Sequence, residues 1–212
     1  KNVIIRTAAL ERAYKSRTEG ISMEKLTVEQ ELVEVAAIED RPQAMTAALE
    51  RIAPSVDLIV TTGAVSVGKK DIMHEALEMA GAKRIFWHIQ MEPGMPTLFS
   101  MYQDTPVISL SGNPFGVAVS IDLLLRPVLH KMTQDEALKT VRKKCLLKNK
   151  FSKTIRGRRY VRAMTDGETV TIPTGLHSNG VLSSLVGCNC LIEMQEGQTG
   201  TSAGEMAEVI LL

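Results

Sequence analysis

The stretch Asp57-Leu58-Ile59-Val60-Thr61-Thr62-Gly63-Ala64-Val65-Ser66-Val67-Gly68-Lys69-Lys70-Asp71 decides how the first two-thirds of the chain fold. Residues 57–62 are β-rich, and the loop that follows them carries two glycines before it reaches Asp71. From about Asp71 apolar residues recur at helical spacing, and Gly81 lies where that helix would end. A strand that passes through a glycine-bearing loop into a helix is the building unit of a doubly wound α/β sheet.

On both sides of this unit, strand and helix signals continue to alternate. Helices are predicted from Pro42 to Pro54 and over residues 114–131, where Pro127 should bend or end the second helix. Further strand composition is found at residues 33–38, 84–91 and 106–110. We therefore expect residues 1–140 to form a three-layer α/β/α domain around a mostly parallel sheet.

The pattern changes after about residue 140, and we place a domain boundary there, inside the polar stretch 133–144. Short β-rich segments then alternate with clusters of Gly, Asn, Asp and Ser, at residues 160–163, 169–172, 190–194 and 208–212. Such spacing predicts that residues 141–212 form a small all-β domain. The polar stretch 15–31 fits either an extension of a helix or an inserted surface excursion.

The composition excludes several classes of protein. Hydrophobic residues make up 44% of the 212 residues and charged residues 23%, which suits a folded core and not a disordered chain. No apolar run approaches the ~20 residues that span a bilayer, so we expect no membrane partner. No charged-then-apolar leader follows Lys1, and the cysteines, Cys145, Cys188 and Cys190, are odd in number. We therefore expect a reduced, cytoplasmic protein.

The basic side chains are unevenly distributed, although the net charge is only +1. Ten of them, uninterrupted by any acid, lie between Arg142 and Arg162. A solvated strand face or a linker explains such a run more readily than an anionic partner does. Aromatic residues make up only 4% of the chain, too few for the stacking platforms that bind single-stranded nucleic acid. We expect no nucleic-acid partner.

The glycine loop after residue 62 is the first candidate site. Gly63 and Gly68 allow tight turns, and Ser66 adds a hydroxyl donor, so the loop suits a phosphate group. Asp71 would cap the following helix, or bind a metal ion or a water molecule. Spacing alone favours this interpretation no more than one in which the glycines only make the turn and Asp71 only caps.

A second loop of the same kind is Ser111-Gly112-Asn113-Pro114. Asn113 as N-cap and Pro114 at the first helical position predict an ordered helix start whose N–H groups favour anions. For this motif alone a purely structural cap is the preferred interpretation. The turn Met91-Glu92-Pro93-Gly94-Met95-Pro96 fits a third wall of one crevice, and turn chemistry alone would also explain it.

Other polar residues are weaker candidates. Cys188 and Cys190 are too close for the usual zinc pair and have no second pair, so buried structural thiols are expected. The four histidines show no metal-ligand spacing, and we expect surface or hydrogen-bonded side chains at His74, His88, His130 and His177.

In these motifs the sequence resembles the MoeA/gephyrin-type molybdopterin molybdenumtransferases. Residues 57–71 are similar to the family's D-hydrophobic-hydrophobic-T-G-G-V-S-V-G…D segment, residues 91–96 to its K-P-G-K-P turn, and residues 110–114 to its L-P-G-N-P loop. Asn2 would match an Asn near the start of the family's first helix. The family's C-terminal β-barrel signature is similar to three pieces of this sequence: residues 177–180, Ser183-Ser184-Leu185 and Asn189.

The resemblance implies that residues 1–140 are the catalytic domain and that the family's small β-barrel follows. Members cleave AMP from adenylylated molybdopterin with a divalent cation, usually Mg²⁺, and place molybdate on the dithiolene; they are homodimers. By resemblance, Asp71 is the first catalytic and metal-binding candidate, and Asp40 is a second catalytic candidate. The implied substrate-binding residues are Thr62, Gly63, Ser66, Gly68, Lys69, Pro93, Gly94, Ser111, Gly112, Asn113, Pro114 and Ser178.

The chain also departs from the family's motifs. Ala64 replaces the second glycine and Ser111 replaces a proline, and both changes are small. Glu92 and Met95 replace the two lysines of the turn, and Glu92 reverses the charge offered to phosphate or molybdate. The two lysines of the first loop would compensate in part.

Two further observations leave alternatives open. The family's upstream T-G-D-E-L motif and two N-terminal domains are missing, so we expect the chain to be the C-terminal half of a larger enzyme. The lost lysines favour a second function, that of a scaffold or binding protein that holds a pterin or a peptide without turnover. A relative of the competence/damage-associated nucleotide proteins, which share the first domain, is a weaker third possibility.

Overall fold

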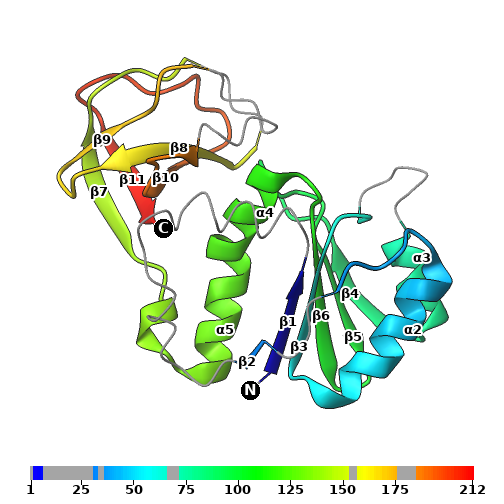
Figure 1. The fold of residues 1–212 in the computed structure, drawn as a ribbon. Coiled ribbons are helices and arrows are strands. Elements are labelled where there is room, and N and C mark those ends of the chain that lie inside the picture. The colour runs from blue at the N-terminus through cyan, green and yellow to red at the C-terminus, as the bar shows by residue number, and fades with distance from the viewer. Residues whose placement is uncertain (1, 7–30, 33–35, 66–71, 153–156, 176–184) are drawn as a thin grey trace. The chain divides into compact units, whose positions relative to one another are not determined.

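A computed structural model of the chain describes residues 2–6, 31–32, 36–65, 72–152, 157–175 and 185–212. The chain forms two compact units (Figure 1). Unit 1 comprises Lys1–Ile89 and Gly94–Val117, and unit 2 comprises Gln90–Pro93 and Ala118–Leu212. The boundary between the two units therefore falls between Val117 and Ala118, within helix α4 (Pro114–Ser120). The domain boundary near residue 140 stays a prediction.

Unit 1 is built on one six-stranded sheet with the strand order β2-β1-β3-β6-β5-β4. The first four of these strands are parallel, whereas β5 runs antiparallel to both of its neighbours. In the register of β3 and β6, Thr61 pairs with Ser109 and Thr62 with Leu110, so the two strands end level with each other. The strands are β1 (Asn2–Arg6), β2 (Glu31–Leu32), β3 (Leu58–Thr62), β4 (Lys83–Trp87), β5 (Leu98–Tyr102) and β6 (Thr105–Leu110).

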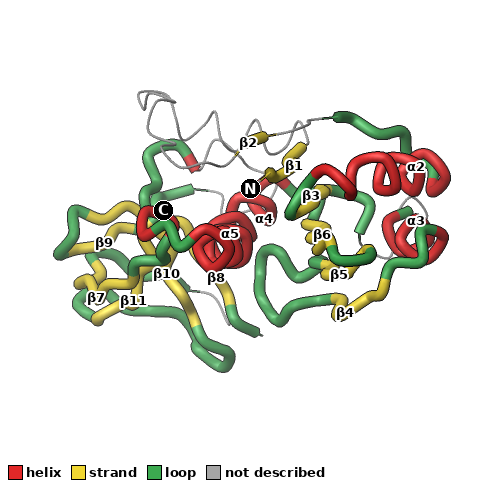
Figure 2. Tube along the Cα trace, turned by 90° about the horizontal axis from the view of Figure 1, so that it is seen from below, coloured by secondary structure: helices red, strands yellow, loops and turns green. Residues whose placement is uncertain are grey.

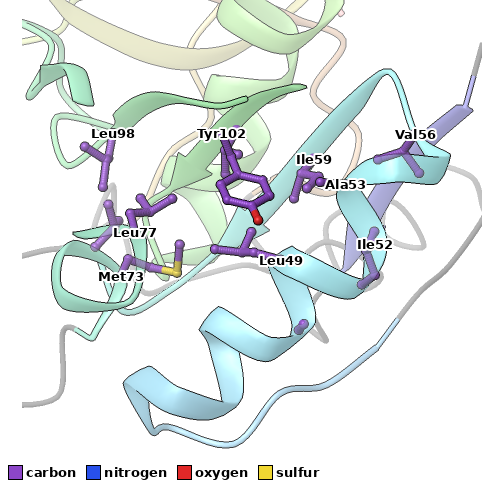
Figure 3. Packing of buried hydrophobic residues seen from close by; sticks show 12 residues of the cluster. Leu49, Ile52, Ala53, Val56, Ile59, Met73, Leu77, Leu98 and Tyr102 are labelled. Atoms are coloured by element: carbon purple, nitrogen blue, oxygen red, sulfur yellow. The ribbon is translucent and has the colours of Figure 1, made fainter. Parts of the chain in front are cut away.

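Two helices, α2 (Pro42–Ile52) and α3 (Met73–Met79), lie side by side next to the strands (Figure 2). Apolar residues at helical spacing turn Leu49 and Ile52 toward the sheet. There they join Ile59, Met73 and Tyr102 in a buried cluster (Figure 3). Burial of these side chains, at about 1.5–3 kcal/mol each, holds the helices against the end of β3.

The apolar stretch after Asn113 forms one long helix in three parts. These parts are α4 (Pro114–Ser120), a π-helical turn (Ile121–Leu125) and α5 (Arg126–Thr133). The helix does not end at Pro127, which directly follows the π-helical turn; there the Arg126 N–H donates to the Ile121 carbonyl. Within the part of the chain that the structure describes, no helix is long and apolar enough to cross a membrane.

Unit 2 contains a closed five-stranded barrel with the strand order β10-β11-β7-β9-β8. Alternate residues, among them Val161, Val170, Ile192 and Val209, point inward and form its core. The strands are β7 (Arg142–Leu147), β8 (Arg159–Thr165), β9 (Thr169–Thr171), β10 (Cys190–Met194) and β11 (Met206–Leu211). The predicted fold class, an α/β domain followed by a small β-barrel, is confirmed.

The three cysteines belong to unit 2 and form no disulfide. Cys190 is buried, as expected for a structural thiol, whereas Cys188, for which burial was also expected, is only half-buried; Cys145 is buried as well. Burial raises the pKa of the Cys190 thiol to about 12, so this thiol stays protonated at neutral pH. Buried, protonated thiols act as small apolar side chains of the core.

Much of the basic run lies on the outside of the barrel. Arg142 contacts both Glu193 and Glu208, and Arg158 pairs with Glu193 at 3.3 Å. The hydrogen bond to Glu193 raises the pKa of Arg142 above its ordinary value. These pairs fit a solvated strand face at Arg142 and Arg158, whereas Arg159 and Arg162 of the same run are buried.

Some sequence-based predictions for the first domain are wrong. Asn2 begins strand β1 and not a helix. Of the strand predicted over residues 33–38, residues 36–38 have no regular structure, and 33–35 lie outside the described residues. The strand predicted over 84–91 ends at Trp87, because His88 takes a left-handed φ of +72° that turns the chain.

Four strands were not predicted: β1, β2, β5 and β7. β5 is a short strand that returns to β6 through a tight turn at Gln103, where φ is +52°. Its antiparallel pairing makes the sheet mixed. β7 contains the basic residues 142–144, whose charges obscure the alternation that buries Cys145 and Leu147.

Candidate functional site

The end of β3 is a tight turn made by Gly63 and Ala64. Their φ angles are +87° and +53°, both in the left-handed region, which costs an alanine roughly 1 kcal/mol more than a glycine. The Gly63 N–H donates to the Leu110 carbonyl at 2.9 Å, and the Met73 N–H donates to the Ala64 carbonyl at 3.0 Å. Thr62, half-buried, precedes this turn. The replacement of the family's second glycine is therefore tolerated at a small energetic cost.

The end of β6 is a capped helix start. The Phe115 and Gly116 N–H groups donate to Asn113 Oδ1 at 3.1 and 3.3 Å, which confirms the predicted N-cap. The Asn113 N–H donates in turn to Ser111 Oγ at 3.2 Å. Pro114 occupies the first helical position, as predicted. The Ser111 hydroxyl thus orders the loop in this chain.

These two loops touch. A Cβ atom on Gly112 would lie 3.2 Å from the Cα of Gly63, closer than ordinary van der Waals contact. A Cβ atom on Gly116 would lie 3.5 Å from the Gly94 backbone nitrogen and from the Ser111 side chain. The ends of β3 and β6 and the turn at Gly94 therefore converge within unit 1, as expected for strand ends that share one edge of a sheet.

Gly94 belongs to a rigid turn with a φ of +104°. Thr97 holds it, since the Thr97 hydroxyl donates to the Gly94 carbonyl at 2.8 Å and the Thr97 N–H donates to the Met95 carbonyl at 2.8 Å. Pro93, just before it, is buried and belongs to unit 2.

Glu92, the residue that replaces a family lysine, is paired with Arg159 within unit 2. The main chain joins the same elements, because the Glu92 N–H donates to the Arg158 carbonyl and the Tyr160 N–H donates to the Glu92 carbonyl, both at 2.8 Å. Arg159 is only 7% exposed. Sequence reasoning missed Arg159, although a reversed charge at Glu92 was a signal that a cation lies nearby.

A cavity of about 460 Å³ lies beside the end of β3. Its floor is apolar, and Asp40, Thr61, Thr62 and Gly63 are among the residues that line it. Thr61 Oγ1 is buried with no hydrogen-bond partner among the described residues. Asp40 is exposed. The structure thus brings Asp40 together with the glycine turn, and it adds Thr61, which sequence reasoning did not select.

Five predicted site residues lie outside the described residues: Ser66, Gly68, Lys69, Asp71 and Ser178. Among the residues that are described, no group of three or more His, Cys, Asp or Glu side chains is arranged to hold a metal ion.

Comparisons with known proteins identify the family. Residues 21–131, more than half of the chain, match the family described as "Probable molybdopterin binding domain". The chain belongs to this molybdopterin-binding family. Residues 144–212 match the "MoeA C-terminal region (domain IV)". The two matches confirm the resemblance to MoeA-type proteins.

Individual relatives agree. The chain is 29% identical over 178 residues to the molybdopterin molybdenumtransferase of Bacillus subtilis (strain 168), covering 82% of this chain and 41% of that protein. It is 28% identical over 159 residues to the protein of the same name from Staphylococcus aureus (strain COL), covering 73% and 38%. The chain therefore spans about two-fifths of the length of these curated relatives.

Solved structures share the fold. The molybdopterin biosynthesis moea protein from Pyrococcus horikosii superposes with a TM-score of 0.71 at 23% identity, over 93% of this chain and 47% of that chain. A molybdenum cofactor biosynthesis protein from Pyrococcus furiosus superposes with a TM-score of 0.70 at 20% identity, over 100% and 67%. These two structures therefore share the fold of this chain.

The contact between the two glycine turns predicts an effect on stability. Gly112→Ala should lower the free energy of unfolding by about 1–3 kcal/mol, because the new methyl group meets the Gly63 backbone. Gly116→Ala is the matched control: its methyl group makes ordinary contacts in a helix, so it should be neutral or stabilise by up to about 1 kcal/mol. Thermal melts of both variants test this. Equal stability of the two would contradict the contact.

The Glu92–Arg159 pair predicts an effect of restoring the family's lysine. Glu92→Lys should destabilise the protein, because the new lysine would face the Arg159 guanidinium, a second cation. We expect a loss of about 1–2 kcal/mol, less than for a buried pair, because the Glu92 side chain is half-exposed. The double change Glu92→Lys with Arg159→Glu should recover most of that loss. Chemical denaturation of the single and double variants forms a double-mutant cycle, and additive effects would rule out the pairing.

Proposed function

We propose that the protein containing this chain is a molybdopterin molybdenumtransferase. It would bind adenylylated molybdopterin, release AMP and place molybdate on the dithiolene. One observation carries the proposal: Gly63 and Gly112 bring two loop ends into contact at the carboxyl ends of parallel strands, in a member of the molybdopterin-binding family. Ligands of open α/β sheets bind at this edge.

The proposed contacts to substrate follow from the backbone. Gly63 turns in the left-handed region, which permits close approach of a phosphate group. Asn113 caps a helix that continues to Thr133, and the dipole of that helix favours an anion near its start. Gly94 completes the proposed binding edge. Ser66, Gly68, Lys69, Pro93 and Ser178 remain proposed substrate contacts.

A magnesium ion is part of the proposal. Mg²⁺ prefers oxygen ligands, and two residues with side-chain oxygens, Asp40 and Thr61, line the cavity beside Gly63; Thr61 Oγ1 has no hydrogen-bond partner among the described residues, so the donor chemistry fits. We assign Asp71 to the ion as its ligand and keep Asp40 as the second catalytic candidate. When bound, the ion would neutralise phosphoryl charge as AMP leaves.

A non-catalytic binding or scaffold protein is the second candidate. The observation that favours it is Glu92, a carboxylate where the family has a lysine. Its pairing with Arg159 offsets that charge. We therefore rank the enzyme first.

One experiment separates the two functions. The whole protein is incubated with adenylylated molybdopterin, Mg²⁺ and molybdate, and AMP is measured by chromatography. Release of AMP together with transfer of molybdenum supports the enzyme. Binding without release of AMP would support the scaffold instead.

The two carboxylates predict a rate effect without a stability effect. Asp71→Asn should slow AMP release by roughly a hundredfold or more, on the order of 3 kcal/mol in the barrier, and Asp40→Asn should act in the same direction. Both should leave the melting temperature nearly unchanged, since an amide keeps size and capping ability. Glu50→Gln, an exposed carboxylate of α2 outside the cavity, is the control and should change neither. Normal turnover of Asp71→Asn would remove it from the site.

We propose in addition that the whole protein is a cytoplasmic homodimer without nucleic-acid or membrane partners. Family resemblance supports the dimer, and the basic run that is paired on the barrel surface argues against a nucleic-acid face. Light scattering of the whole protein should give twice the chain mass. A monomer at high concentration would contradict the proposal.

A further inference from the structure

Trp87, the chain's single tryptophan, contacts the glycine loop from the edge strand β4. It is the last residue of β4, and its indole Nε1–H donates to the Val65 carbonyl at 3.0 Å. Val65 is 1% exposed and follows the Gly63–Ala64 turn directly. The side chain of an edge strand therefore holds the main chain as it enters the loop.

The orientation of the indole is fixed by two imidazole rings. The His74 ring meets Trp87 edge-on, with centroids 4.6 Å apart and an angle of 81°. The His88 ring lies 3.8 Å from it at 36°. The main chain of His88 is held in turn, since the His88 main-chain N–H donates to the Thr97 carbonyl at 3.0 Å. Because the ring plane is constrained, the direction of the N–H donor is constrained too.

Among the described residues, three hydrogen bonds hold the base of the loop: two join main-chain atoms, and one comes from a side chain. Gly63 N–H to the Leu110 carbonyl and Met73 N–H to the Ala64 carbonyl join main-chain atoms, so changes of side chain leave them in place. The bond to the Val65 carbonyl needs the indole of Trp87. This third bond is the one that a single substitution can remove while the fold is retained.

We propose that Trp87 is a positioning residue for the glycine loop: its N–H sets the path of Gly63–Val65 and hence the affinity for the anionic end of the substrate. The inference rests on the proposed function of this loop. Trp87 contacts the loop's main chain, so its loss should weaken substrate binding and leave the chemical step nearly unchanged. Where the loop must then be ordered by the ligand, the net free energy of one ordinary hydrogen bond is taken from binding, which corresponds to about a fivefold rise in Kd.

The test uses Trp87→Phe in the whole protein, with adenylylated molybdopterin as the probe. Phenylalanine keeps an aromatic ring between the two imidazoles and removes the N–H donor. The matched control is Phe86→Leu, on the same strand, which contacts Phe99 with ring centroids 5.5 Å apart and loses an aromatic ring without touching the loop. We expect Trp87→Phe to raise Kd and KM about fivefold with kcat nearly unchanged, and Phe86→Leu to lower only the melting temperature.

A second measurement follows the hydrogen bond itself. In the wild-type protein, the Trp87 indole N–H should exchange slowly with solvent in NMR spectra, because it is bonded to the Val65 carbonyl. Fast exchange, an unchanged Kd for Trp87→Phe, or equal weakening of binding by both variants would each overturn the inference.

Failure of the proposed function looks different. A wild-type protein that binds the probe without releasing AMP contradicts the enzyme, while the comparison of Kd values still decides the role of Trp87. A wild-type protein that does not bind the probe overturns both.

Discussion

The site depends on the parallel pairing of β3 with β6. Their register sets Thr62 opposite Leu110, so both strands end at the same level and the main chain turns after each of them. Gly63 and Gly112 then come so close that a Cβ atom on Gly112 would be only 3.2 Å from the Gly63 Cα. A main-chain contact of this kind leaves no room for a side chain on Gly112, and it brings the two loops together at one place. The turn at Gly94, the Asn113 cap and the cavity beside β3 are arranged around it.

Much of the fold follows from local sequence signals. The β-rich run before Gly63 and the apolar spacing of α2 predict their elements correctly, because both combine a strong period with clear end signals. β7 was not predicted, since Arg142 and its neighbours are exposed and only the barrel buries the intervening residues. β5 was not predicted because its place depends on pairing with β6 across the sheet, a non-local contact.

The candidate site could be predicted in its backbone and not in its side-chain partners. Glycines, Asn113 and Pro114 report local conformation, and the structure gives them the expected left-handed turn and helix cap. Arg159 and Trp87 act across strands that are distant in sequence, so no local pattern indicates them. The one available signal was negative: a carboxylate at Glu92 where the resemblance leads one to expect a cation.

These differences explain which departures from the family the chain accepts. The turn at Gly63 and the loop at Gly112 are formed by main-chain contacts, so they depend on the path of the main chain more than on side-chain identity. Ala64 keeps that path at the cost of a strained φ, and Ser111 keeps it by accepting a hydrogen bond from the Asn113 N–H. Glu92 changes a charge, which backbone geometry cannot absorb, and there the chain has a buried arginine as the partner. Substitutions that preserve the path therefore need no second change, whereas a substitution that reverses a charge requires one.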